Sequence, residues 1–163
     1  MTTRESPDVT AREGGGVAVR LRTPADLDAC AEALALVHAA DRYPVDWPGD
    51  PQGWLTPHGL LRAWVAYEDG RVLGHVGLAD TPEGPEVTRL FVAPAARGRG
   101  LAPRLLATVR EAAGTPVLLE VSHEGRAAIA LYERLGWRRV RSSRARWLNA
   151  AGEPALLHHY VSP

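Results

Sequence analysis

The sequence contains almost no cysteine, no lysine and no long apolar run. Cys30 is the single cysteine among 163 residues, which excludes an intrachain disulfide and a zinc site built on cysteines. It falls in an Ala- and Leu-rich segment, where a free thiol commonly packs as a small apolar side chain, so we expect it to be inert. No stretch approaches 18 consecutive apolar residues, and we therefore expect no membrane span.

The first 16 residues lack the apolar centre of a secretory signal peptide and end in three glycines. Their polar composition predicts a flexible tail over residues 1–16. The remaining residues 17–163 have the length of one domain with one substantial core. We expect this domain to reside in the cytoplasm.

The net charge is zero, which argues against generic binding to nucleic acid or to a membrane surface. The charge is nevertheless unevenly distributed. Residues 97–146 carry 11 Arg against four acidic residues, whereas residues 1–96 carry eight Arg against 14 acidic residues. A basic half suits a polyanionic small ligand and an acidic half suits a cationic co-substrate, although an unevenly charged surface without a ligand would have the same composition.

Apolar periodicity and turn residues predict the element order β α loop β β β α β α β β, a mixed α/β (α+β) fold with about seven strands and about four helices. Helices are expected to begin at Pro24, Leu101 and Arg126, and residues 41–57, dense in Pro, Gly and Trp, are expected to form a long loop with at most a short helix. The strands are expected at residues 17–22, 63–67, 71–78, 86–92, 117–121, 137–141 and 155–161.

The strongest chemical signal is the segment from Leu90 to Ala102. A strand closes at Pro94, Gly98 and Gly100 form a turn, and a helix follows, so free backbone N–H groups and a positive helix end converge. This arrangement predicts a phosphate or pyrophosphate site. A P-loop would need a lysine, and a dinucleotide-binding fold would need three spaced glycines, so neither of these sites fits the segment. An ordinary connection between a strand and a helix, rich in Gly and Arg, could share the short glycine pattern.

Two motifs carry a resemblance to a known family. Arg97-x-x-Gly100-x-Ala102 resembles the (Gln/Arg)-x-x-Gly-x-(Gly/Ala) acyl-CoA signature of the GNAT N-acetyltransferases. Downstream, Leu119-Glu120-Val121 and then residues 128–137, with Leu131-Tyr132 and Gly136-Trp137, are similar to the later motif of that family, in a form close to the ribosomal-protein N-terminal acetyltransferases. The resemblance covers residues 87–139.

The resemblance implies a mostly antiparallel sheet that splays open at its centre, between residues 86–92 and residues 117–121. Acetyl-CoA and an amine would meet there, and the acetyl group would pass by direct attack through a tetrahedral intermediate, without a metal. Backbone amides of the turn would hold the CoA pyrophosphate, and the preceding strand would pair with the pantetheine arm. The implied CoA-binding residues are Leu90, Phe91, Val92, Arg97, Gly98, Arg99, Gly100, Leu101 and Ala102.

The resemblance also implies the acid and the base. Tyr132 would give a proton to the departing thiolate, although its helical spacing also fits a core aromatic. Glu120 is the leading base for the amine, with an ion-paired strand residue as the alternative reading. Glu86 is the second choice of base and His123 the third.

The acceptor is expected to be a primary amine, on a small molecule or at a peptide or protein N-terminus. Trp47 and Trp54 are candidates for lining its pocket, or for pinning the long loop to the core. Two alternatives stay open, a non-catalytic acyl-CoA sensor and an antibiotic-type amine acyltransferase. The spacing of the histidines matches no known metal site. The resemblance also allows a homodimer. The sequence departs from the family pattern at Gly125, where the family often has Asn.

Overall fold

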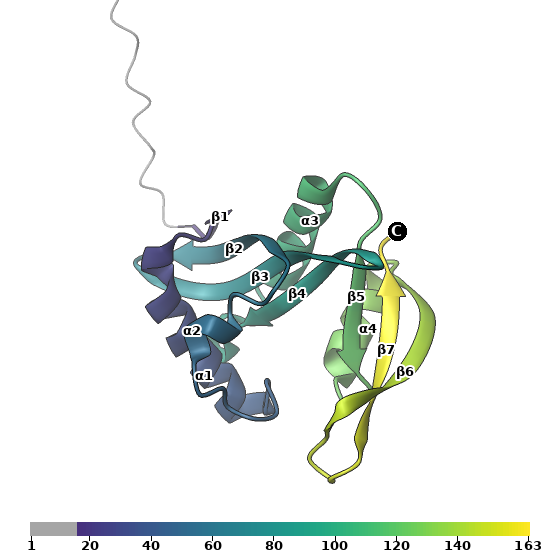
Figure 1. The fold of residues 1–163 in the computed structure, drawn as a ribbon. Coiled ribbons are helices and arrows are strands. Elements are labelled where there is room, and N and C mark those ends of the chain that lie inside the picture. The colour runs from purple at the N-terminus through teal and green to yellow at the C-terminus, as the bar shows by residue number, and fades with distance from the viewer. Residues whose placement is uncertain (1–15) are drawn as a thin grey trace, which may run out of the picture.

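The computed structural model describes residues 16–163, so the tail predicted for residues 1–16 lies, except for Gly16, outside the described residues. Within the described part the chain forms a seven-stranded sheet with the order β1-β2-β3-β4-β5-β7-β6 (Figure 1). Every neighbouring pair is antiparallel except β4 and β5. The strands are β1 (Ala18–Leu21), β2 (Leu60–Glu68), β3 (Arg71–Thr81), β4 (Gly84–Val92), β5 (Leu118–Ser122), β6 (Arg138–Leu148) and β7 (Pro154–Val161).

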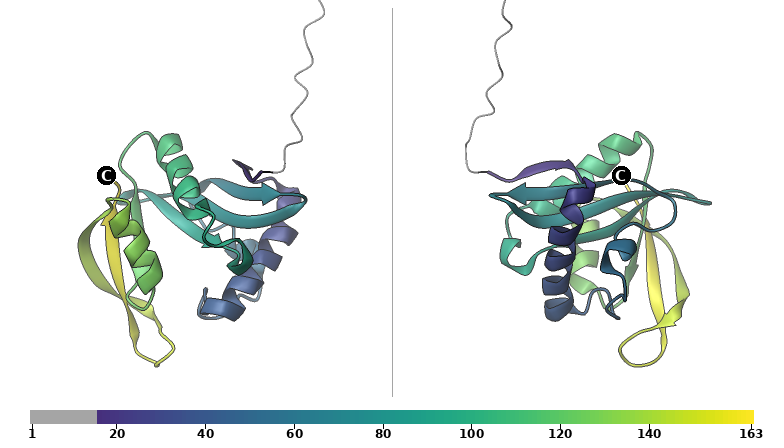
Figure 2. Two further views of the ribbon diagram at one scale, coloured as in Figure 1. Left: turned by 180° about the vertical axis from the view of Figure 1, so that it is seen from behind. Right: turned by 60° about the vertical axis from the view of Figure 1, so that its left-hand side comes forward.

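Four α-helices, counted over the described residues, flank the sheet: α1 (Leu27–Asp41), α2 (Pro51–Trp54), α3 (Leu101–Ala113) and α4 (Arg126–Arg134). The two side views show α1 and α2 on one face of the sheet and α3 and α4 on the other (Figure 2). None of these helices combines the length and apolar character needed to cross a bilayer. The predicted element order and the mixed α/β architecture are therefore confirmed.

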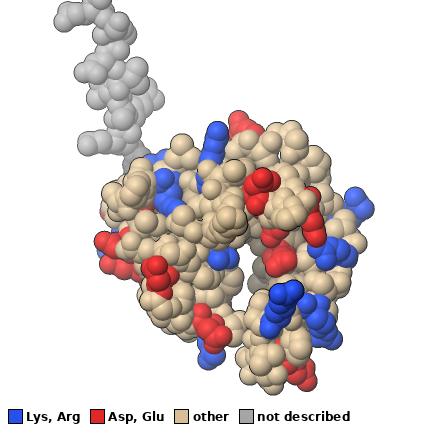
Figure 3. Space-filling model, viewed as in Figure 1, with Lys and Arg blue, Asp and Glu red and all other residues tan. Residues whose placement is uncertain are grey.

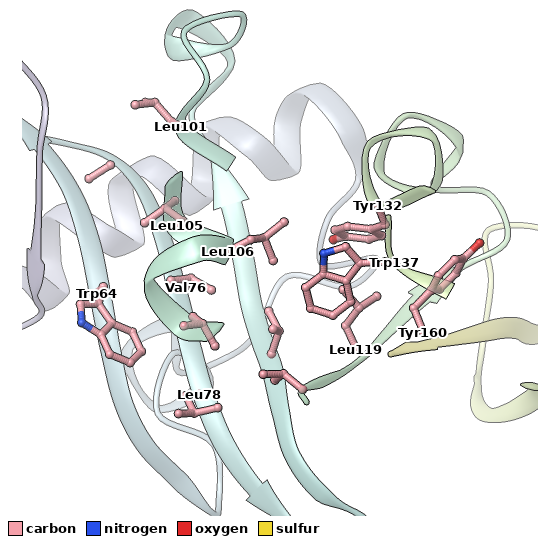
Figure 4. Close-up of a cluster of buried hydrophobic side chains, with 14 of the residues drawn as sticks. Trp64, Val76, Leu78, Leu101, Leu105, Leu106, Leu119, Tyr132, Trp137 and Tyr160 are labelled. Atoms are coloured by element: carbon pink, nitrogen blue, oxygen red, sulfur yellow. The ribbon is translucent and has the colours of Figure 1, made fainter. Parts of the chain in front are cut away.

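Strand alternation divides the apolar residues between two cores. In β2, Trp64 and Ala66 face the core beneath α3 and α4, whereas Val65 faces the core beneath α1. The larger core takes its helical side chains from α3 at i, i+4, i+5 and i+8 spacing, and it takes Tyr132 and Trp137 from the second motif (Figure 4). That stripe consists of Leu101, Leu105, Leu106 and Val109.

The sheet opens at its centre. Strands β4 and β5 are joined at one position only, the pair Glu86 and Leu118, after which the two strands diverge. On the other edge of β4 the register with β3 shifts between His75 and Gly77, and Arg89 adopts a left-handed φ of +53°. This β-bulge turns the second half of β4 away from β5, which produces the splay that the family resemblance implies.

Several element boundaries differ from the prediction. Strand β2 begins at Leu60 and not at residue 63, and β3 ends at Thr81 and not at residue 78. The final hairpin is longer than expected, because β6 continues to Leu148 and not to residue 141. Its Arg- and Ser-rich sequence has no apolar alternation, and it is a strand because β7 pairs along it. The first helix is also preceded by a 3-10 turn (Pro24–Asp26), in which the Asp26 carboxylate accepts bonds from the Thr23 N–H and from both arms of Arg20.

The larger core should set the stability of the domain. Leu106 is 1% exposed within it, so Leu106→Ala should lower the free energy of unfolding by about 2–5 kcal/mol. Leu36 on α1 is 60% exposed and provides a matched control, because Leu36→Ala should cost less than about 0.5 kcal/mol. Urea denaturation followed by circular dichroism measures both. Equal losses in the two variants would contradict the core assignment.

Candidate active site

The turn before α3 presents backbone donors without internal acceptors. A 3-10 turn (Pro94–Ala96) ends β4, and the chain then passes through Gly98 and Gly100 with left-handed φ values of +78° and +73°. Gly100 is the N-cap of α3 and no side chain caps that helix end. Within residues 16–163 the amides of Gly98, Arg99 and Gly100 donate no hydrogen bond. Free amides at the positive end of a helix dipole are the donors that a bound anion accepts from, so this turn has the features expected of an anion site.

The space above this turn is open. A Cβ placed on Gly98 or on Gly100 would meet no heavy atom within 4 Å, so in both residues the missing side chain leaves room for a ligand to approach the backbone. The turn therefore fits a pyrophosphate, and the group expected to fill it is the pyrophosphate of acetyl-CoA.

Two arginines of the turn carry its positive charge. Arg97 forms an ion pair with Asp41 at the end of α1, and Arg99 forms one with Glu68 of β2 at 2.9 Å. The bond from Arg99 lowers the pKa of Glu68. Both pairs are solvent-exposed and of the kind that contributes about 0–1 kcal/mol, so either guanidinium can turn to a phosphate at small cost.

The second half of β4 has one free edge. Beyond Glu86 the strand no longer pairs with β5, so the backbone of residues 90–92 has no strand partner on that side, and the Val92 carbonyl there accepts only a long bond of 3.5 Å from the Arg97 guanidinium. Phe91 is buried in the core beneath α1, and Leu90 and Val92 pack against the core beneath α3. Their side chains are thus committed to packing, and it is the backbone that remains for an extended ligand such as a pantetheine arm.

Tyr132 reaches the splay from the α4 face. Its ring is 7% exposed and packs 6.1 Å from Trp137 and 6.2 Å from Tyr160, centroid to centroid. Figure 4 shows the Tyr132 hydroxyl pointing to the β4 side of the gap, whereas the Tyr160 hydroxyl points away from it. No partner for the Tyr132 hydroxyl occurs among the described residues, and burial raises its pKa, so it is a protonated donor facing the gap.

Glu86 and Glu120 approach the gap from the opposite face. Glu86 pairs with Leu118, and Glu120 lies two residues along β5, so both carboxylates lie on the face opposite α3 and α4. Burial, together with the nearby charges of Glu120 and Glu83, raises the pKa of Glu86 to about 7, against an opposing effect of Arg141. Glu120 remains partly exposed, with its carboxylate 3.5 Å from His159 Nδ1.

His123, the third candidate base, lies elsewhere. Its Nδ1 is 2.9 Å from His158 Nε2, and it lines a shallow hollow between α4 and β6 on the other side of the sheet. Within residues 16–163 no three His, Cys, Asp or Glu side chains are grouped to hold a metal. The expectation of a metal-free site stays a prediction.

The loop before α2 forms one wall of a hollow in the surface. Figure 3 shows this hollow between the α1–α2 half and the β6–β7 hairpin, with acidic side chains gathered on its upper right wall and basic side chains below them on the hairpin. Trp47 is 41% exposed and packs beside His38, with ring centroids 5.4 Å apart and ring planes tilted by 53°. The Arg89 guanidinium carbon lies 4.0 Å above the centroid of the Trp54 ring, and the Trp54 ring makes an edge contact with Tyr43.

This geometry is matched by sequence comparison. Residues 28–137 match the profile of the Acetyltransferase (GNAT) family, which is more than half of the chain. The chain belongs to the GNAT acetyltransferase family. The fold and motifs assigned above agree with that membership.

Among relatives of this GNAT chain, the N-alpha-acetyltransferase RimI of Mycobacterium tuberculosis is 32% identical over 85% of this chain and 89% of its own length. A mycothiol acetyltransferase of Rhodococcus jostii is 35% identical over 54% of this chain. The match spans only 32% of that longer enzyme, and 38% of an uncharacterized protein of Mycobacterium leprae that is 32% identical over 83% of this chain.

Solved GNAT structures share the fold. The ribosomal-protein-S18-alanine N-acetyltransferase of Escherichia coli superimposes with a TM-score of 0.72 over 91% of this chain and 94% of its own, at 19% identity. Arabidopsis thaliana NAA60 in complex with acetyl-CoA superimposes with a TM-score of 0.70 over 90% and 97% of the two chains, at 20% identity.

Sequence reasoning missed two parts of this site. Tyr43 and Arg89 both contact Trp54 beside the hollow. His159 of β7 contacts Glu120. The strand alternation of β7 could have placed His159 on the same face as Glu120, had their pairing been known. No local pattern signals the left-handed Arg89, because a bulge depends on the neighbouring strand.

Gly100 and Gly114 offer a matched pair for testing the phosphate turn. Both cap α3, both have left-handed φ values, of +73° and +64°, and a Cβ on either would meet no atom within 4 Å. Gly100→Val should weaken CoA binding at least about tenfold, or ~1.4 kcal/mol, because the valine side chain fills the open space above the turn where the pyrophosphate is expected. Gly114→Val imposes similar backbone strain at the far helix end and should leave affinity intact. Isothermal titration calorimetry on the folded variants decides, and unchanged affinity in Gly100→Val would place the phosphate elsewhere.

Proposed function

We propose that this protein is an N-acetyltransferase that transfers the acetyl group of acetyl-CoA to a primary amine by direct attack. The observation that carries the proposal is the convergence of three features on the splay. These are the phosphate-binding turn, the carboxylates Glu86 and Glu120 on one face, and the Tyr132 hydroxyl on the other.

The donor side is supported by the open turn and the free β4 edge. Backbone amides of residues 98–102 would hold the pyrophosphate, with Arg97 or Arg99 adding charge. The Val92 N–H would polarise the thioester carbonyl as negative charge develops on it. The thioester supplies an activated acetyl group, and the protein supplies position, a base and an acid.

Proton removal from the amine falls to the Glu86 and Glu120 pair. The sequence hypothesis favours Glu120, whereas a pKa of about 7 for Glu86 suits a base that is half ionised at neutral pH. We place the base on Glu86 and assign to Glu120 the charge that raises its pKa.

Glu86 takes one proton from the ammonium, directly or through a water, and the free amine nitrogen then attacks the thioester carbon. The nitrogen loses a second proton, which replaces through water the proton that Tyr132 donates. The tetrahedral intermediate collapses with cleavage of the carbon–sulfur bond, and Tyr132 gives its proton to the leaving thiolate. Acid and base act from opposite faces of the sheet, which matches an amine that enters from one face and a thiol that leaves on the other.

The acceptor class follows from the wall of the hollow. The charges of Glu83 and Glu120 both act on Glu86, and this group of carboxylates favours an acceptor that arrives as an ammonium ion. Trp47 and Trp54, from the loop before α2, are proposed to line the facing wall. The full-length similarity to an N-alpha-acetyltransferase favours a peptide or protein N-terminus, with a small-molecule amine, including an antibiotic-type amine, as the other source. The cytoplasmic location and a homodimer stay predictions.

The activity is tested by following free thiol release from acetyl-CoA over a panel of peptides with free N-termini and of small amines. Steady turnover with at least one N-terminal peptide, absent for the same peptide with a blocked N-terminus, is expected. Turnover only with small amines would move the acceptor to that class. Tight CoA binding without turnover on any amine would favour an acyl-CoA sensor.

Tyr132 and Tyr160 are a matched pair of buried tyrosines. Tyr132→Phe keeps the ring and should leave stability and acetyl-CoA affinity unchanged, while kcat falls about ten- to a thousandfold, or ~1.4–4 kcal/mol of barrier. The Tyr160 hydroxyl donates to Glu133 at 2.7 Å and lies outside the gap, so Tyr160→Phe should retain kcat. Single-turnover rates distinguish the two. Wild-type chemistry in Tyr132→Phe would leave water as the proton donor.

The pH profile separates the two carboxylates. The base must be ionised, so kcat/KM should fall as the pH drops below about 7, the pKa of Glu86. Glu86→Gln should lower kcat/KM about a hundredfold and remove this limb. Glu120→Gln removes a neighbouring negative charge and should move the limb to lower pH, whereas Arg141→Gln should move it to higher pH. If Glu120→Gln abolished the limb and Glu86→Gln kept it, Glu120 would be the base.

A further inference from the structure

His75 of β3 is fully buried and bonded at both ring nitrogens. Its Nδ1 lies 2.8 Å from the backbone oxygen of Arg89, and its Nε2 lies 3.0 Å from the guanidinium of Arg22. A guanidinium can only donate, so Nε2 accepts and the ring proton is on Nδ1, which donates to the Arg89 carbonyl. Burial lowers the pKa of His75 to about 4, so this neutral form persists at ordinary pH.

The bond from His75 satisfies the backbone at the bulge. Arg89 has a φ of +53°, and the register between β3 and β4 shifts at this point, so the regular ladder is interrupted beside the Arg89 carbonyl. The imidazole supplies a donor to that carbonyl, and its ring stacks on Phe91 with centroids 5.2 Å apart and planes 12° apart. His75 therefore holds the segment of β4 that leads into residues 90–92.

The same network holds the wall of the hollow. Arg22 donates to the Leu55 carbonyl at 2.7 Å and to Thr56 Oγ1 at 2.8 Å, and Arg89 Nε donates to the Trp54 carbonyl at 2.8 Å. These acceptors follow each other at the C-terminal end of α2, where carbonyls lack helical partners. Arg22 and Arg89, which both bond to His75, thus also hold the C-terminal end of α2. Trp54 of α2 in turn contacts Tyr43.

We propose that His75 is a positioning residue that couples two elements. One is β4, the strand proposed to bind the acyl donor, and the other is α2, which forms part of the hollow proposed to bind the amine. His75 lies on β3 and is fully buried, so it can touch neither substrate. It acts through its hydrogen bonds with the Arg89 carbonyl and the Arg22 guanidinium. Loss of its two hydrogen bonds would release the bulge and loosen α2 together. The role in catalysis rests on the proposed function, whereas the structural coupling does not.

The test compares two substitutions at His75 with a matched control. His75→Phe keeps a ring that can stack on Phe91 and removes both hydrogen bonds, whereas His75→Gln retains one donor and one acceptor. The control is His158→Phe, because His158 is 4% exposed and also bonded at both nitrogens, to Ser142 and His123, but contacts neither β4 nor α2. All variants are compared well below their melting temperatures.

In His75→Phe, kcat/KM for the amine should fall at least about tenfold through both kcat and the amine KM, while the Kd of CoA changes less than about threefold. The intact phosphate turn is the reason for the small change in Kd. His75→Gln should recover activity to within about threefold of the wild type, and His158→Phe should stay within the same range. A His75→Phe enzyme with unchanged kinetics, or one no worse than His158→Phe, would overturn the proposal.

Hydrogen exchange gives a readout that does not require activity. Amide exchange of residues 51–60 and 86–92 should accelerate together, at least about tenfold, in His75→Phe and stay unchanged in His158→Phe. Acceleration in only one of the two segments, or in neither, would refute the coupling. If the wild-type protein turned over no amine at all, the proposed function would fail while this exchange result would still decide the structural role of His75.

Discussion

Strand β4 separates from β5 inside the sheet, and the features of the candidate site are arranged around that opening. The two strands are parallel neighbours joined at Glu86 and Leu118, and the bulge at Arg89 turns β4 away after that point. An unpaired strand edge inside a domain is costly unless something binds it or covers it. Here the open edge lies beside the phosphate-binding turn, so the defect in the sheet is the place where an extended acyl-CoA can be accommodated.

Charge is separated across this gap. The donor end presents backbone amides, the α3 dipole and two arginines held by the exposed carboxylates of Asp41 and Glu68. The opposite face presents Glu86 and Glu120, close enough that the charge of Glu120 raises the pKa of Glu86. A polyanionic donor and a cationic acceptor, as proposed here, would be attracted to different faces of the same opening, which agrees with the uneven charge distribution along the chain.

Buried polar contacts stabilise the opening. His75 is enclosed by Arg22, Arg89 and Phe91, and its hydrogen bonds replace ladder bonds that the bulge removes. Such a network keeps an irregular backbone in one conformation, because leaving either partner unbonded in the interior is unfavourable. Membership of the GNAT family accounts for the fold and its two sequence motifs, whereas these contacts are described for this particular chain.

The element order, the apolar faces and the glycine turn before α3 could be predicted from the sequence alone. These depend on local rules: apolar spacing marks α3, and Gly98 and Gly100 adopt left-handed φ values that other residues avoid. The extent of β6, the bulge at Arg89 and the proximity of Glu86, Glu120 and His159 became visible only in the folded structure. Each of these is a relation between strands far apart in the chain, set by pairing and burial, which residue spacing along one segment does not encode.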